Sequence, residues 1–145
     1  MGTWDVGPFD NDDAADFALA LDEATLDNRE SLVRSALERA ANAMDYLSDT
    51  DAVLAVAAAA LVVAQHPGGE PTCANYGPSQ PMPKFPADFK KLAVDALGQV
   101  VAESSELAER WDESSNGRKW SQAITRLRDI LDPPIPPQEE VLFDI

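Results

Sequence analysis

The stretch that decides the fold is Ala52-Val53-Leu54-Ala55-Val56-Ala57-Ala58-Ala59-Ala60-Leu61-Val62-Val63-Ala64, an unbroken apolar run of thirteen residues. A helix that crosses a bilayer needs about 20 such residues. A shorter helix that is apolar on every side is typical of the centre of a soluble core. The run therefore predicts a buried, alanine-rich central helix that continues to about Gln65, with other helices packed around it.

The segments on both sides of this run carry apolar residues at three- and four-residue spacing, which is typical of amphipathic helices. They predict an all-α, single-domain bundle of about five helices. The boundaries follow from capping residues, prolines and glycines. The expected spans are 10–23, where Asp10 is the cap, 27–46, 52–65 after a cap at 48–51, 86–112, and 118–131. Gly98 falls inside the fourth helix and predicts close packing or a slight bend there.

Two proline-rich segments lie outside the expected helices. Residues 66–85 hold five of the eleven prolines, Cys73 and the only histidine, and a loop of about twenty residues is usually either functional or mobile. Residues 133–145 begin with four prolines in five positions, which favours an extended conformation. We therefore expect a helical domain over residues 1–132 and a tail over 133–145 that is either an ordered strap or a detachable peptide.

The net charge of −15 excludes several classes of partner. Nucleic acids and anionic membranes are bound by lysine and arginine, which are scarce here. A basic protein or a cation suits this charge better. One cysteine forms no internal disulfide, and no secretory signal is readable at Met1, so a cytoplasmic location is expected. Abundant alanine, and seven arginines against four lysines, indicate a bacterial source.

Four aspartates near the start form the sharpest chemical feature, namely Asp10, Asp12, Asp13 and Asp16. On a helix, carboxylates three and four residues apart share a face, so this group could hold a hard divalent cation. It does not follow the ligand series of an EF-hand loop. Capping and compensation of the helix dipole explain the same residues without a metal, and we favour that interpretation.

Nothing in the chain forms a catalytic signature. His66 and Cys73 are each the only residue of their kind, and no pattern brings them together for nucleophilic catalysis. We therefore expect no catalytic residues and no cofactor apart from the conceivable cation. The remaining candidates for interaction contacts are Trp4, Phe9, Asn11 and Trp111, although tryptophans are more often core anchors.

Two stretches resemble a known family. Met1-Gly2-Thr3-Trp4 followed by residues 7–17, and residues 105–113 followed by Trp120, are similar to segments of a bacterial domain of unknown function, the family numbered 4259. The chain departs from that pattern at Asp5, where glycine is common, and at Phe17, where tryptophan is common. The resemblance implies a small cytosolic bacterial protein and supplies no activity. It favours the interpretation that the N-terminal motif is primarily a folded structural clasp and only secondarily a functional site.

Two functions follow from the sequence. The first is a non-enzymatic interaction module for a basic protein, for example a toxin domain that this chain neutralises. It rests on the acidic charge and on the absence of a nucleophile or phosphate-binding motif. The alternative is a metal-dependent hydrolase that uses the N-terminal aspartates. The sequence predicts no oligomeric state.

Overall fold

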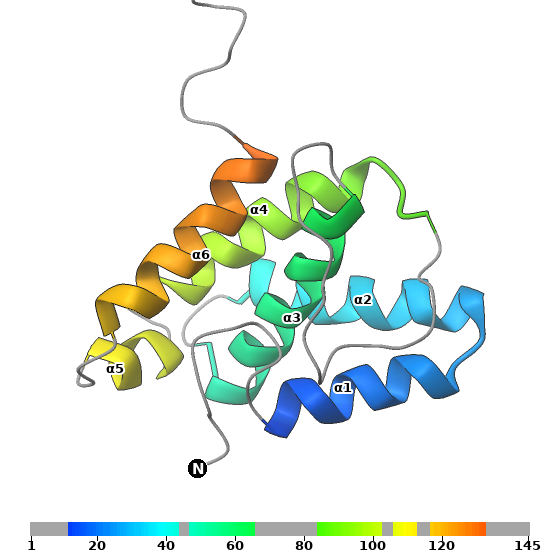
Figure 1. The fold of residues 1–145 in the computed structure, drawn as a ribbon, viewed down its shortest axis with the longest axis horizontal. Coiled ribbons are helices and arrows are strands. Elements are labelled where there is room, and N and C mark those ends of the chain that lie inside the picture. The colour runs from blue at the N-terminus through cyan, green and yellow to red at the C-terminus, as the bar shows by residue number, and fades with distance from the viewer. Residues whose placement is uncertain (1–11, 44–46, 66–83, 103–105, 113–116, 133–145) are drawn as a thin grey trace, which may run out of the picture.

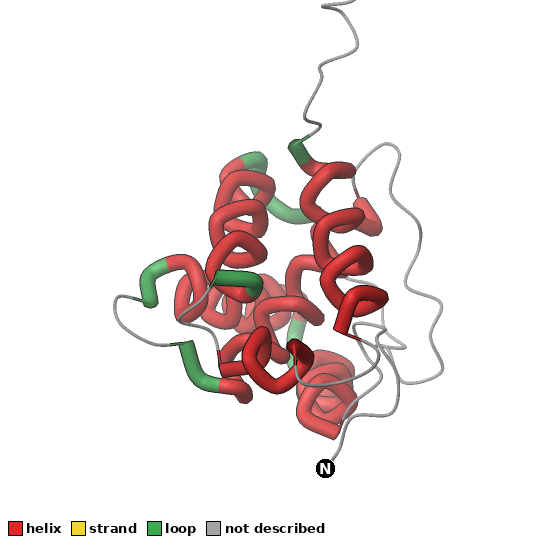
Figure 2. Tube along the Cα trace, turned by 90° about the vertical axis from the view of Figure 1, so that its left-hand side faces the viewer, coloured by secondary structure: helices red, strands yellow, loops and turns green. Residues whose placement is uncertain are grey.

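The computed structural model describes residues 12–43, 47–65, 84–102, 106–112 and 117–132. Within these ranges the secondary structure is helical, as Figure 2 shows, which confirms the all-α prediction. The helices pack into one bundle (Figure 1). In chain order they are α1 (Asp12–Glu23), α2 (Leu26–Ala41), α3 (Asp49–Gln65), α4 (Asp88–Val100), α5 (Glu106–Asp112) and α6 (Gly117–Leu131).

Helix α3 lies at the centre of the bundle, as the apolar run predicts. Every residue from Ala52 to Val63 is buried except Leu54, which is half-buried. The helix contacts all five other described helices (Figure 1). Alanines let these neighbours approach closely, while leucine and valine fill the gaps between them. The Ser48 hydroxyl accepts a hydrogen bond from the Asp51 amide at 3.2 Å, so the expected cap at residues 48–51 is confirmed.

Helix α2 is shorter than expected and begins earlier. Thr25 is its N-cap, and the Thr25 hydroxyl accepts a hydrogen bond from the Asn28 amide at 3.3 Å. The expected start at Asp27 is therefore wrong. The expected end near Tyr46 is also wrong, because the helix ends at Ala41 and Asn42 is the C-cap. Asparagine competes with the helical backbone for hydrogen bonds and so favours helix ends over helix interiors.

The single helix expected over 86–112 is two helices, α4 and α5. Helix α4 ends where Val101 forms the C-cap and donates to the carbonyl of Leu97 at 3.4 Å. Val100 and Val101 are both β-branched, which lowers their helix propensity, and Ser104 and Ser105, which follow after two intervening residues, favour caps over helix interiors. The described chain therefore has six helices instead of about five.

Two details of α4 and α6 complete the packing. Of the two alternatives expected at Gly98, close packing is wrong, because a Cβ atom placed there would meet nothing within 4 Å beyond its chain neighbours and the backbone of α4; the slight bend stays a prediction. In helix α6, Trp120, Ile124 and Leu131 are all buried, so they form its inner face. The tail 133–145 and the segment 66–83 lie outside the described residues. Among those described, no helix combines the length and the apolar character that crossing a membrane requires.

Candidate functional site

Helix α1 carries the chemically most distinctive surface of the described chain. Its sequence holds five acidic residues and no lysine or arginine. Ala14, Phe17, Ala18 and Leu21 are buried against the bundle, which fixes the orientation of the helix. The opposite side of the helix is exposed to solvent, because apolar residues at helical spacing occupy only one side of it, while Ala15 and Asp22 are half-buried.

We define the α1 acidic face as Asp13, Asp16, Leu19 and Glu23, which are all exposed. They follow one another at spacings of three, three and four residues, so they form a stripe along the helix. Leu19 is 56% exposed and is the most exposed large apolar side chain of the described residues. Leu26, at the start of α2, is 52% exposed. The face therefore combines an apolar side chain with flanking carboxylates.

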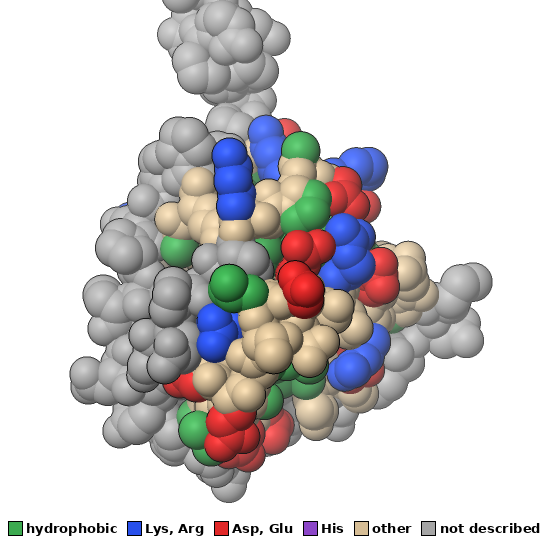
Figure 3. Space-filling view, turned by 90° about the vertical axis from the view of Figure 1, so that its right-hand side faces the viewer, with side chains coloured by type: hydrophobic (Ala, Val, Ile, Leu, Met, Phe, Trp, Pro, Cys, Tyr) green, Lys and Arg blue, Asp and Glu red, His purple; other side chains and the backbone are tan. Residues whose placement is uncertain are grey.

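The described basic side chains form their ion pairs away from this face. Arg34 pairs with Glu38 and Asp88, Arg39 with Asp51, and Lys91 with Asp95. Asp13, Asp16 and Glu23 form no ion pair with a described residue. Figure 3 shows one side of the bundle, on which basic and acidic side chains lie among one another. The negative potential of this face is thus not neutralised within the described part of the chain.

Arg29 is the basic residue that reaches α1, and it binds the end of the helix instead of the acidic face. Its side chain is buried, with 9% of the residue exposed. Its Nε donates a hydrogen bond of 2.8 Å to the carbonyl oxygen of Leu21. The carbonyls of the last helical turn have no partner within the helix, so a buried guanidinium there satisfies a backbone group and the negative end of the helix dipole.

The predicted metal group is only partly within the described residues. Asp10 lies outside them, and the side chain of Asp12 is not described. Asp13 and Asp16 are both exposed and lie about one turn apart on α1. Among the described side chains, no group of three or more histidine, cysteine, aspartate or glutamate residues is arranged to hold a metal ion. The metal site stays a prediction, and His66 and Cys73 lie outside the described ranges.

The four residues proposed as interaction contacts are also only partly within the described residues. Trp4, Phe9 and Asn11 lie outside the described residues. Trp111 on α5 is half-buried and stacks on Trp120 of α6, with ring centroids 5.8 Å apart and ring planes 7° apart. Trp120 is buried, so this pair joins α5 to α6 at the edge of the core. The stack gives Trp111 a packing role, and its role as an interaction contact stays a prediction.

Sequence reasoning missed a contact between α2 and α4. Arg34 pairs with Glu38, four positions later on its own helix, at 4.0 Å. Its shorter contact is to Asp88, at 3.1 Å, and this hydrogen bond raises the pKa of Arg34 above its ordinary value. The guanidinium also lies 4.6 Å from the ring centroid of Phe89. These contacts hold α4 against α2.

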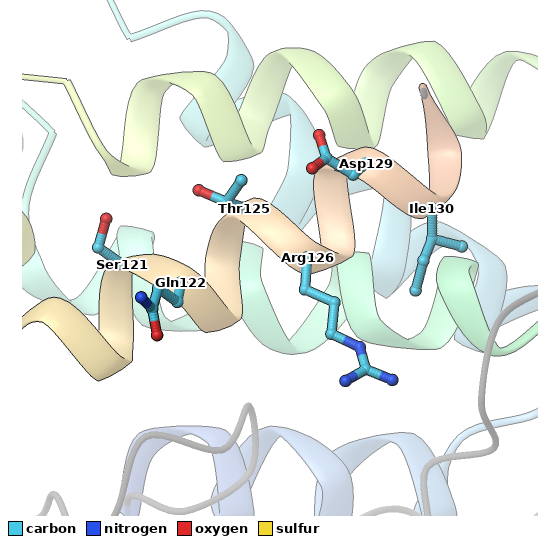
Figure 4. Close-up of a pocket in the computed structure, with 6 residues that line it drawn as sticks. All are labelled: Ser121, Gln122, Thr125, Arg126, Asp129 and Ile130. Carbon is cyan, nitrogen blue, oxygen red and sulfur yellow. The ribbon is translucent and has the colours of Figure 1, made fainter. Parts of the chain in front are cut away.

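A second surface appears on the outer side of α6. Six residues of this helix line an open hollow of about 440 Å³. Figure 4 shows that the six lie along most of the length of α6: Ser121, Gln122, Thr125, Arg126, Asp129 and Ile130. Sequence analysis did not predict this hollow. The only signal for it was that α6 carries polar and basic residues at every outward position, which is also true of many solvated helices.

Comparison with known proteins gives one result. The model of a family described as "Domain of unknown function (DUF4259)" matches residues 2–123. The match includes helices α1 to α5 and the first half of α6. No curated protein and no solved structure shows significant similarity to the chain.

Proposed function

This chain belongs to the DUF4259 family, and we propose that it acts as a non-enzymatic binding module whose α1 acidic face docks on a basic protein. The observation that carries the proposal is the composition of that face. Asp13, Asp16 and Glu23 form no ion pair with a described residue, and they surround the exposed side chain of Leu19. The chain as a whole is also acidic, with a net charge of −15.

The two kinds of side chain on the face have different physical roles in binding. Carboxylates attract a basic partner over distances of about 10 Å and orient it, which raises the association rate more than the affinity. An exposed leucine supplies an apolar anchor that fills a pocket on the partner and excludes water from the charged contacts around it. Along the stripe, Leu19 lies between Asp16 and Glu23, so the apolar anchor has a carboxylate on each side.

The rigid mounting of α1 favours binding without a change of shape. Its inner face is buried, and its last turn is held by the hydrogen bond from Arg29 to Leu21. A surface that is already ordered loses little conformational entropy when it binds. A basic toxin domain neutralised by this chain is a concrete partner of the required chemistry.

A pull-down from a bacterial lysate with the full chain tests the charged part of the proposal. The wild-type chain should retain a basic protein at low ionic strength and lose it at high ionic strength. Asp13→Lys with Asp16→Lys should abolish retention. The matched control is Glu109→Lys, which reverses an exposed carboxylate on α5 and should leave retention unchanged. Retention that ignores salt, or that survives the double reversal, contradicts the proposal.

A second pair of variants tests the apolar anchor. Leu19→Ala should weaken retention of the same protein while leaving its salt dependence in place, because only the apolar contact is removed. Val101→Ala is the control, since Val101 is an exposed apolar residue at the end of α4. Equal retention by Leu19→Ala and wild type would exclude Leu19 from the interface.

A further inference from the structure

We draw no further inference here: the strongest candidate, the open hollow of about 440 Å³ on the outer side of α6, carries nothing, because nothing in the structure shows what covers it and two of the four basic side chains of that helix, Lys119 and Arg126, already interact with other groups.

Discussion

Gly98 shows how one residue limits the stability of a helix without any contact. A methyl group at this position would extend from α4 into open space, because no other atom lies within 4 Å of the added Cβ. Glycine in the middle of a helix costs about 0.5–1 kcal/mol relative to alanine, through the entropy of the unfolded chain. Gly98→Ala should therefore raise the free energy of unfolding by about that amount, measured by urea denaturation. A destabilised variant would show that the space beside Gly98 is occupied.

Arg29, a buried residue of α2, stabilises the end of α1. Its buried guanidinium donates to the Leu21 carbonyl at 2.8 Å. A hydrogen bond from a charged donor contributes about 1.5–3 kcal/mol, so Arg29→Met should lower the free energy of unfolding by that order, measured by urea denaturation. Arg39→Met is the matched control, because Arg39 is exposed and its pair with Asp51 spans 3.8 Å. Exposed pairs contribute less than about 1 kcal/mol. Equal losses in the two variants would contradict the role assigned to Arg29.

At the scale of the element, α1 is either a charged docking surface or half of a metal site. Two exposed carboxylates one turn apart, Asp13 and Asp16, hold a divalent ion weakly in water. We therefore expect Mg²⁺, Mn²⁺ and Ca²⁺ to leave the Tm of the full chain unchanged. A metal that bound the folded state would raise the Tm. A rise that is lost in Asp13→Asn with Asp16→Asn would establish the cation site and support the hydrolase alternative.

The elements also differ in how well sequence predicts them. Helix α3 was predicted because burial on all sides leaves a continuous apolar run, and the inner faces of α1 and α6 were predicted from their periodicity. Helix ends were predicted less well. Thr25 and not Asp27 caps α2, and Val101 ends α4, because neighbouring residues compete for the same backbone groups. No local sequence pattern shows which of the neighbouring residues will form the cap.

The features of the candidate site also differ in how well the sequence predicts them. The outward position of Asp13 and Asp16 follows from the period of α1 alone. The contact between Arg34 and Asp88 joins residues 54 positions apart, and no local pattern contains it. The hollow on α6 depends on which outward side chains lie beside one another, and this too is a property of the folded chain.

At the scale of the whole molecule, two of the described helices carry charge of mainly one sign, whereas α2 and α4 carry both signs. Helix α1 has five acidic residues and no basic ones, while α6 has four basic residues and one acidic one. Helix α3, with its buried stretch from Ala52 to Val63, contacts both helices and is an apolar scaffold. Charge reversals on α1 leave the side chains of α6 unchanged, so the two surfaces can be varied independently.

The affinity of a basic partner at two ionic strengths tests the central claim most directly. For the wild-type chain, the affinity should fall as ionic strength rises. Asp13→Lys with Asp16→Lys should weaken binding by about tenfold or more at low ionic strength and remove most of the salt dependence, because like charges then face each other. Glu109→Lys should stay within about twofold of wild type. An unchanged affinity for the double reversal would contradict the claim that the α1 acidic face is the binding surface.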